Sequence, residues 1–371
     1  MTKKSRILAW VGGLAVLLGL AVFVVRNVAD FELDDARVST LKFRSGAADL
    51  FGTLMLPAHV QSAPVVLIIH GDGPMDRFAS RGYLPLINSL LDAGIGVFTW
   101  DKQGIGESSG NWLDQSMSDR AAEALAALAC VRMAPGVAGQ KVGFLGFSQG
   151  GWVIPRAASE GDPDFSVIIG GAVNWRRQGM YYTRLRLADE GLARAEIDVR
   201  VREQYQKNDK VFGPLKDQDA AHAFPDMDRA HFNFVLKNYN EDVTPALKTM
   251  KGPVLAVWGA QDVNVDAAED SNVYRAQFAG ASGRQVVVVP NATHGLLRAG
   301  LFNYQLLSQW PRWKTYLFVA LGRHAYAPST LAFISGWITS SSSTERPTAG
   351  GQSTNVGASL ARDAPRGRRS I

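Results

Sequence analysis

The chain has 371 residues, 46% hydrophobic and 20% charged, a composition that is typical of globular proteins and excludes disordered or collagen-like classes. Its one cysteine, Cys130, excludes intrachain disulfides and cysteine-rich metal sites. The formal charge of +5 comes from the two ends, because residues 27–337 hold 30 basic and 32 acidic residues; the charge therefore gives no argument for a nucleic-acid partner.

The N-terminal segment, residues 1–29, is predicted to be a membrane anchor or a signal segment. Ile7–Val25 is an unbroken apolar run of 19 residues, and as a helix it would be about 28 Å long, close to the thickness of a bilayer core. Lys3, Lys4 and Arg6 precede the run and acidic residues follow it, which places the remainder outside the inner membrane. The length of the run favours an uncleaved single-pass anchor over a signal peptide whose cleavage would release the domain to the periplasm.

Residues 30–338 are predicted to form one α/β domain. Short, almost continuously apolar runs alternate with helical patterns, as strands buried on both faces of a parallel sheet do in three-layer α/β folds. The expected strands cover residues 38–43, 51–56, 65–70, 96–100, 142–145, 167–170, 254–258 and 285–289, and the expected helices cover 84–92, 119–132 and 150–159.

The alternation is interrupted once, at about residues 174–248. This segment has helical periodicity and mixed charge, and it is too long for a structureless loop. It predicts a helical cap over one edge of the sheet; the alternative is a set of extra helices that cover the core without touching a ligand.

The C-terminal segment, residues 339–371, consists mostly of Ser, Thr, Gly, Arg and Pro. Such a composition buries too little apolar surface to offset the entropy of ordering. The segment is predicted to be a disordered tail.

The strongest chemical signal is the hexapeptide 146–151, Gly-Phe-Ser-Gln-Gly-Gly, which directly follows an expected strand and opens an expected helix. A serine on such a turn is held in a strained, exposed position, and the flanking glycines let the backbone turn. Ser148 is therefore predicted to be a nucleophile.

A serine nucleophile needs a base that accepts its proton and an acid that orients the base. His294 and Asp262 each follow an expected strand, at the same edge of the sheet as Ser148, and are the candidates for base and acid. Asp266 is the rival acid, while Asn174 follows the preceding strand without a carboxylate. The histidines with a weaker claim are His59, His70, His222, His231 and His324.

The sequence His-Gly-Asp-Gly-Pro at 70–74 follows another expected strand. Acyl transfer passes through an oxyanion that two backbone N–H groups can hold, and Asp72 and Gln149 are predicted to supply them. If Asp72 is one of the donors, its carboxylate must point away from the oxyanion; otherwise a neighbouring amide is the donor. An ordinary tight turn is the alternative to an oxyanion site. The glycines of residues 101–108 match no phosphate-binding pattern, so a structural turn is expected there, with no nucleotide cofactor and no metal ligand spacing.

These motifs together resemble the α/β-hydrolase superfamily over roughly residues 38–338, and most closely its bacterial branch of esterases, dienelactone-hydrolase-like and serine-peptidase-like members. The resemblance implies an eight-stranded, mostly parallel sheet with a helical cap inserted after the sixth strand. It also implies Ser148 as nucleophile, His294 as base and Asp262 as acid. Two residues depart from the branch: Asp72 stands where small or neutral residues are commoner, and Gln103 stands where Arg is common.

Residues 296–321 form a second departure, because in many relatives a final helix follows the histidine soon, whereas here 328–338 has that pattern. The segment is apolar and carries Trp310, Trp313 and Tyr316 beside basic residues. Either it is a helix pair packed on the core, or it touches the bilayer or forms an acyl-binding wall.

The function expected from these residues is a membrane-anchored serine hydrolase that cleaves small-molecule carboxylic esters through an acyl-enzyme. Peptidase or thioesterase activity on the same triad is the alternative within serine chemistry. A membrane-tethered binding protein on the same fold is the alternative without catalysis.

Overall fold

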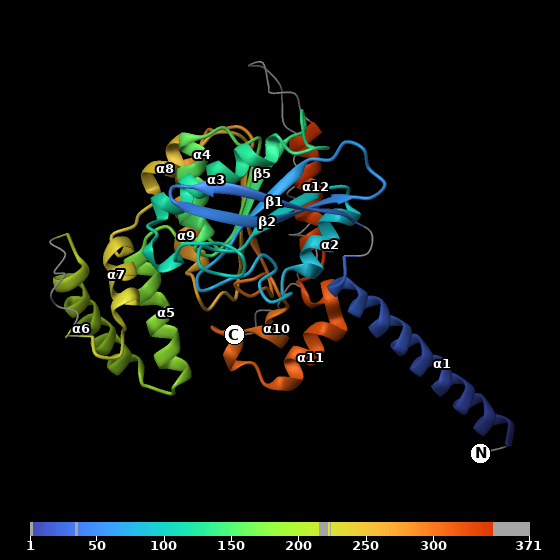
Figure 1. Ribbon diagram of the computed structural model, residues 1–371. Coiled ribbons are helices and arrows are strands. Elements are labelled where there is room, and N and C mark those ends of the chain that lie inside the picture. The colour runs from blue at the N-terminus through green and yellow to red at the C-terminus, as the bar shows by residue number, and fades with distance from the viewer. Residues whose placement is uncertain (1–2, 34–35, 215–221, 223, 344–371) are drawn as a thin grey trace.

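Eight strands form one sheet, in the order β1-β2-β4-β3-β5-β6-β7-β8. The computed structural model describes residues 3–33, 36–214, 222 and 224–343 (Figure 1). The strands are β1 Ala36–Ser45, β2 Ala48–Pro57, β3 Val65–Ile69, β4 Gly96–Trp100, β5 Val142–Phe147, β6 Ser166–Ile169, β7 Val254–Gly259 and β8 Arg284–Val289. β1, β2 and β4 pair antiparallel and all other neighbours pair parallel, which confirms the predicted sheet.

The central strands are buried on both faces. Along β3, Val65 and Leu67 belong to one apolar core, while Val66 and Ile68 belong to a second core on the opposite face. Both sets are fully buried because side chains alternate between the faces of a strand and each face carries helices. This explains why the sequence reads as continuous apolar runs.

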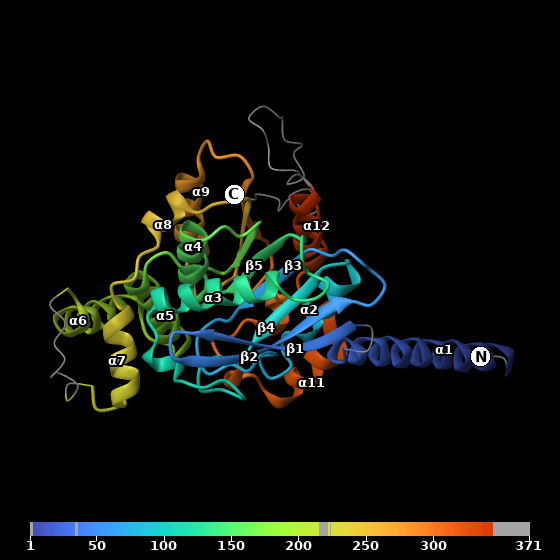
Figure 2. The same ribbon diagram turned by 45° about the horizontal axis from the view of Figure 1, so that its top comes forward.

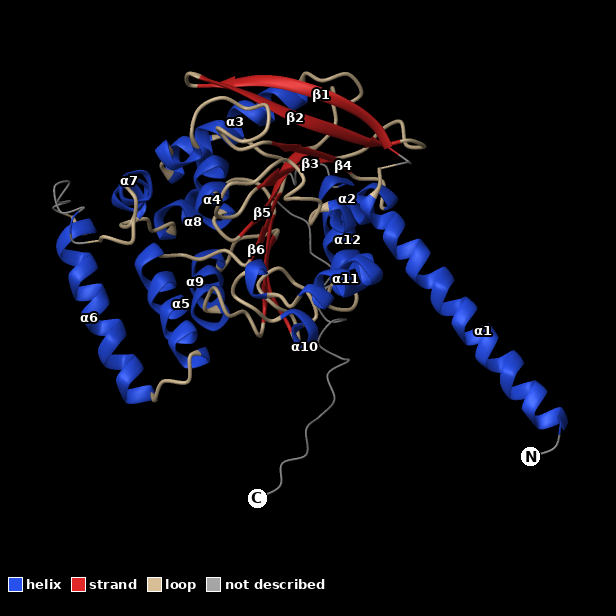
Figure 3. Ribbon diagram, turned by 60° about the horizontal axis from the view of Figure 1, so that its bottom comes forward, coloured by secondary structure: helices blue, strands red, loops and turns tan. Residues whose placement is uncertain are grey.

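Helices cover both faces of the sheet (Figure 3). On one face lie α3 Met117–Arg132, α4 Gly150–Glu160, α8 Thr244–Thr249 and α9 Ala267–Phe278. On the other face lie α2 Leu84–Asp92 and α12 Thr330–Ser343. The two layers and the sheet between them are the three-layer fold that the sequence predicts.

The segment after β6 forms a cap beside the sheet (Figure 2). Its helices are α5 Trp175–Asp189, α6 Arg194–Phe212 and α7 Arg229–Asn238. They have their own apolar core around Phe212, Phe232 and Tyr205. The last helix of the predicted cap segment, α8, instead packs on α4 and α9, so the cap itself consists of α5 to α7.

Residues 296–321 fold as short helices: α10 Ala299–Phe302, η4 Leu307–Gln309 and α11 Arg312–Leu321. The rings of Phe302, Trp310 and Phe318 contact one another on the inner side. The side chains of Trp313 and Tyr316 are 58% and 66% exposed on the outer side. One side of the segment therefore packs on the protein, as the first of the two hypotheses requires, and the other side is free.

The N-terminal helix α1 spans Lys3–Val28 and is followed by the 3-10 helix η1 Ala29–Phe31. Residues Gly12–Phe31 are long and apolar enough to cross a membrane by length and composition. α1 projects from the body of the protein (Figure 1), but its end is fixed: Asp30 pairs with Arg323 at 2.5 Å in the 3-10 helix η5 Gly322–Ala325.

The C-terminal helix α12 continues to Ser343, whereas the predicted tail starts at residue 339. The hydroxyl groups of Thr339, Ser342 and Ser343 donate to carbonyls four residues earlier. Such bonds do not favour a helix by themselves, so the extension follows from packing of the helix, whose Leu331, Ile334 and Ile338 lie in the second apolar core. Residues 344–371 of the predicted tail lie outside the described residues.

Candidate active site

Ser148 lies on the turn between β5 and α4. Its backbone has a φ of +52°, a left-handed conformation that is rare for residues other than glycine. The turn is held by two hydrogen bonds: the Ser148 N–H donates to Ile169 in β6 at 2.9 Å, and the Gly151 N–H donates to the Ser148 carbonyl at 2.8 Å. Gly151 packs so closely on Gly171 that a Cβ there would meet the Gly171 backbone at 2.4 Å. The strained serine is thus fixed by the glycines around it.

Asp262 and His294 form a hydrogen-bonded pair, 2.7 Å from carboxylate oxygen Oδ2 to ring nitrogen Nδ1. The Asp262 side chain is fully buried, and its other oxygen accepts the backbone N–H groups of Asn264 and Val265 at 2.7 and 2.9 Å. These bonds fix the carboxylate in one orientation. The rival acid, Asp266, instead caps the N-terminus of α9.

Gly170 connects this pair to the serine. A Cβ at Gly170 would lie 2.8 Å from Nδ1 of His294, so the imidazole ring rests directly on the Gly170 backbone. The residue before it, Ile169, accepts the Ser148 N–H. The structure therefore brings Ser148, Asp262 and His294 to one edge of the sheet, from loops that follow β5, β7 and β8.

The turn at 70–74 lies against Ser148, because a Cβ on Gly71 would be 3.5 Å from the serine Cβ. The exposed Asp72 accepts a hydrogen bond at 2.9 Å from the side-chain amide of Gln149. The side-chain carbonyl of Gln149 in turn accepts from the buried Arg120, which also donates to the His70 carbonyl at 2.8 Å. The Asp72 carboxylate is therefore engaged by Gln149, and Arg120 ties the two predicted N–H donors together.

Lys102 holds the same turn from the other side. Its ammonium donates to the carbonyls of Gly71 and Gly73, at 2.7 and 2.9 Å, on either side of Asp72. The side chain is almost fully buried and lies 5.2 Å from the Trp112 ring, on the 3-10 helix η2 Trp112–Asp114. Burial lowers the pKa of the lysine well below its ordinary value. Lys102 fixes the carbonyls of this turn, so the N–H groups between them have a set direction.

The rest of the 101–108 turn is structural. Asp101 accepts three hydrogen bonds from Arg77, one from its backbone and two from its guanidinium. A Cβ on Gly106 would lie 2.4 Å from that carboxylate, so the close approach requires glycine. This ion pair fastens residues 101–108 to the loop that follows the 70–74 turn.

The other histidines that the structure describes in detail have different surroundings. Buried His70 contacts the Trp100 carbonyl at 2.6 Å, and burial, followed by the Lys102 charge, lowers its pKa to about 3. His231 pairs with Asp228 at the start of α7, and the His324 ring contacts Phe23 of α1.

The cap reaches the site through α5. The Tyr181 hydroxyl donates to the Asp262 carbonyl at 2.8 Å, and the Gln178 amide donates to the Asn264 carbonyl at 2.9 Å. α5 thus buttresses the loop that carries the acid. The cap also holds a cavity of about 340 Å³ between α5 and α6, but Arg176 and Arg184 in its wall pair with aspartates of α6, and no triad residue lines it.

Comparison with known proteins identifies the family. The sequence model of the alpha/beta hydrolase family matches residues 65–301, more than half of the chain. The chain belongs to this family. A comparison with curated proteins gave no match.

Two solved structures illustrate the likeness of this alpha/beta hydrolase. It is similar to the Pyrococcus furiosus esterase Pf2001, with 18% identity and a TM-score of 0.50 over 78% of this chain and 92% of that chain. It is also similar to DcsB, solved with a substrate analogue, with 14% identity and a TM-score of 0.52 over 83% and 100% of the two chains. At these identities the likeness shows the fold. Family and fold together support a hydrolase.

Two residues of the site were missed by sequence reasoning: Arg120 and Lys102. Arg120 lies on the buried stripe of α3, in register with Met117, Ala124 and Val131. A charge on an apolar helical stripe is a readable signal that the residue meets a buried polar partner. Lys102 is the second residue after an apolar strand, but its contacts with a distant loop leave no local pattern.

Proposed function

We propose that this alpha/beta hydrolase is a serine hydrolase that cleaves carboxylic esters through an acyl-enzyme intermediate. The observation that carries the proposal is the left-handed Ser148 at the strand-to-helix turn after β5, at the same edge of the sheet as the hydrogen-bonded Asp262–His294 pair, whose members follow β7 and β8. A strained serine beside an oriented imidazole is the arrangement that activates a hydroxyl for acyl transfer.

In the proposed mechanism, His294 Nε2 takes the proton from Ser148 Oγ as that oxygen attacks the carbonyl carbon of the ester. The backbone N–H groups of Asp72 and Gln149 hold the oxyanion. The imidazolium then gives its proton to the leaving alcohol, and an acyl-serine remains. Water, deprotonated by His294, attacks this ester; the imidazolium then returns the proton to Ser148 Oγ as the acid is released. Asp262 bonds Nδ1, so it holds the tautomer whose Nε2 accepts the proton.

We further propose that α1 is a single-pass anchor in the inner membrane and that the catalytic domain lies on the extracytoplasmic side. The basic residues before the apolar run and the acidic residues after it support this orientation. Accessibility of Met133, 84% exposed on the domain, tests it: a cysteine placed there in a Cys130→Ser background should react in intact cells with a reagent that cannot cross the inner membrane. Reaction only after lysis would contradict the orientation.

Fluorophosphonate labelling of the full-length protein tests the nucleophile. Wild type should be labelled, and Ser148→Ala should lose both labelling and ester hydrolysis, with a fall in kcat of about 10⁶. Ser159→Ala is the matched control, because Ser159 lies on α4 and its hydroxyl donates to the Arg156 carbonyl; this variant should label like wild type. A folded wild-type protein that takes no label would favour the binding-protein alternative.

The reaction class is tested by comparing p-nitrophenyl esters with aminoacyl anilides and acyl thioesters. An ester hydrolase should cleave the p-nitrophenyl esters with the highest kcat/KM. If the enzyme instead cleaves the anilides or the thioesters preferentially, and Ser148→Ala abolishes this activity, the protein is a peptidase or a thioesterase that uses the same triad.

A further inference from the structure

An exposed apolar surface lies on the segment between α10 and the end of α11. We call Leu306, Leu307, Trp313 and Tyr316 the outer face; they are 51%, 74%, 58% and 66% exposed. Outside α1, the described residues expose only three other large apolar side chains, and these lie singly on different parts of the protein: Val38, Met133 and Val199. Scattered apolar residues need no explanation, but four within 11 residues do.

The outer face is not needed to fold the segment. Phe302, Trp310 and Phe318 already supply an inner apolar side, and Phe318 contacts Phe31 of η1 at 5.6 Å between ring centroids. The Lys314 ammonium lies over the Trp313 ring at 5.3 Å. Exposed aromatic residues beside basic ones are typical of elements that lie in a membrane interface.

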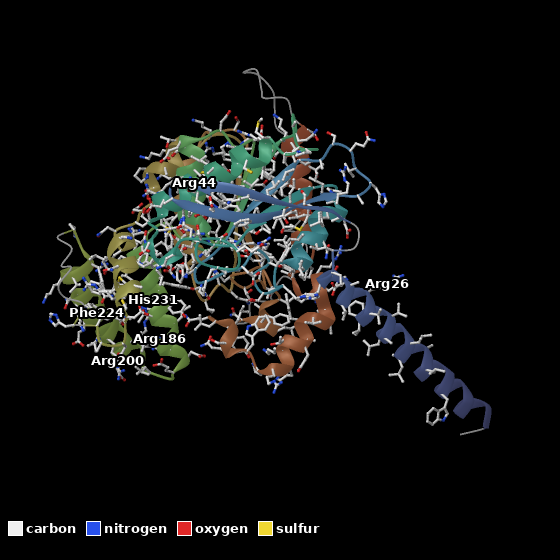
Figure 4. The ribbon with its side chains drawn as sticks, viewed as in Figure 1. Arg26, Arg44, Arg186, Arg200, Phe224 and His231 are labelled. Atoms are coloured by element: carbon white, nitrogen blue, oxygen red, sulfur yellow. The ribbon has the colours of Figure 1, made fainter. Side chains whose placement is uncertain are left out.

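The helix α11, which carries Trp313 and Tyr316 of the outer face, lies beside the point where α1 leaves the domain (Figure 1). The Asn27 amide donates to the Ala320 carbonyl of α11 at 3.1 Å, and Asp30 pairs with Arg323 just after α11. The exposed apolar surface of α1 begins in the same turns of the helix, where the side chain of Val25 is 69% exposed. The neighbouring Arg26 lies at the end of α1 next to the domain (Figure 4). Because no flexible linker separates them, α1 and α11 have a fixed relative position.

The same segment borders the candidate active site. The Gln305 amide donates to the carbonyls of Val263 and of Tyr182 in α5, and the Asn264 side chain donates to the Gln305 carbonyl at 2.9 Å. The outer face therefore continues, through one residue, into the loop that carries Asp262 and into the cap.

We propose that the outer face seats on the surface of the phospholipid bilayer that α1 enters, and that it holds the rim of the active site at that surface. Burial of its four side chains in the interface adds an apolar contribution to that of the anchor. The occupant is a lipid bilayer because the face is continuous with the helix that is built to enter one. Esters dissolved in the bilayer then reach Ser148 without crossing bulk water. This proposal rests on α1 as a membrane anchor, and its substrate consequence rests on the proposed ester hydrolysis.

An environment-sensitive label tests the seating without using activity. Full-length protein carrying Cys130→Ser receives a single cysteine, Leu307→Cys or Tyr316→Cys, is labelled with the fluorophore NBD and is reconstituted in phosphatidylcholine vesicles. Emission should shift to the blue and be quenched by lipids with a spin label near the headgroup. Val199→Cys and Met133→Cys are matched controls, since they are exposed apolar positions away from the outer face. The emission of NBD at these two positions should stay that of a label in water.

If the protein floats with the vesicles but the labels at 307 and 316 keep the emission of NBD in water, the proposal is overturned. Protein that fails to float with vesicles would overturn it as well, because α1 would then not insert.

Activity separates this proposal from the proposed function. The double variant Leu307→Ser/Trp313→Gln should hydrolyse a water-soluble p-nitrophenyl ester at the wild-type rate, while hydrolysis of a long-chain ester dissolved in the vesicles falls about tenfold. An equal effect on both esters would contradict delivery from the bilayer. If wild type hydrolyses neither ester and the labels at 307 and 316 are still buried, the function is wrong and the seating stands.

Discussion

Two buried cations, Arg120 and Lys102, surround the turn that is proposed to hold the oxyanion. Arg120 connects Gln149 to the 70–74 turn, so its removal releases the two proposed N–H donors from each other. We expect Arg120→Met to lower kcat about 10²-fold with a smaller change in KM, because the loss of one oxyanion donor has an effect of that size. Steady-state kinetics on a p-nitrophenyl ester measure both constants.

Arg132→Met is the control, because Arg132 lies on the same helix but pairs with Asp164 at the surface. It should keep the wild-type kcat. If the kcat of Arg120→Met falls only in proportion to the folded fraction of the protein, Arg120 acts through folding and not by positioning the donors.

Gly170 is a second residue whose role is local and testable. Its φ of +59° and its contact with the His294 ring both require glycine. Gly170→Ala should cost about 1–2 kcal/mol of stability from the left-handed backbone and should also displace the imidazole, with a large loss of kcat. Thermal unfolding and ester hydrolysis measure the two effects separately.

Gly280→Ala is the control that separates the backbone strain of a left-handed alanine from displacement of the His294 imidazole. Gly280 has a φ of +76°, yet a Cβ there meets nothing within 4 Å. This variant should show a similar loss of stability and a wild-type kcat. Equal kcat values for Gly170→Ala and Gly280→Ala would mean that the His294 ring does not rest on the Gly170 backbone.

At the scale of elements, α9 is tied to the chain that leaves β6 by a buried carboxyl group, Asp270, which accepts the Val173 N–H at 3.1 Å. Burial raises the pKa of Asp270 to about 8, above its ordinary value of 3.8. A raised carboxyl pKa contributes stability that is fully present below the unfolded pKa and is lost as pH rises toward the folded one. Wild type should therefore lose stability between about pH 4 and pH 8.

Asp270→Asn removes this titration and keeps an acceptor for Val173. The difference in melting temperature, variant minus wild type, should rise from pH 5 to pH 8 and level off above it. A difference that does not depend on pH would show that Asp270 is ionised throughout this range.

The sequence predicts most elements because local pattern and tertiary role agree in them. The range of α2 and that of β4 coincide with the expected ones, and the strand–turn–helix around Ser148 follows from an apolar strand and from the glycines on either side of the serine. Asp262 could be preferred to Asp266 by its position after a strand. The hydrogen bonds of both residues agree with that preference.

What the sequence does not predict depends on contacts between distant elements. The contacts of Lys102 with Gly71 and Gly73 join loops that follow two different strands, and no local pattern encodes them. The separation of α8 from the cap and the extension of α12 to Ser343 depend on packing in the same way. The sequence does not show which aromatic residues of the segment 296–321 are buried and which are exposed, because this depends on the ring contacts of Phe302, Trp310 and Phe318.

For the whole molecule, the junction of α1 with the domain determines how the protein is held at a membrane. The side chain of Asp30 is 6% exposed, and Arg323 bonds it through backbone and guanidinium and also reaches Asp92. Arg323→Met would leave a buried carboxylate without its partner and should lower the free energy of unfolding by about 3–5 kcal/mol. Chemical denaturation of the full-length protein in detergent measures this change.

Arg177→Met provides the comparison, since its pair with Glu269 is more than 45% exposed on both sides. It should change the free energy of unfolding by about 1 kcal/mol or less. Equal effects of the two substitutions would show that the junction is not a stabilising part of the fold.

The junction also has a consequence for proteolytic processing. Proteases cut most readily where the chain is exposed and loosely held, but here the last turn of α1 and η1 contribute Asn27, Asp30 and Phe31 to the folded domain. A peptidase that removes leader sequences would have to act on this stretch before α11 and η5, nearly 300 residues later, have folded onto it. Once the domain is complete, these contacts protect the link between helix and domain.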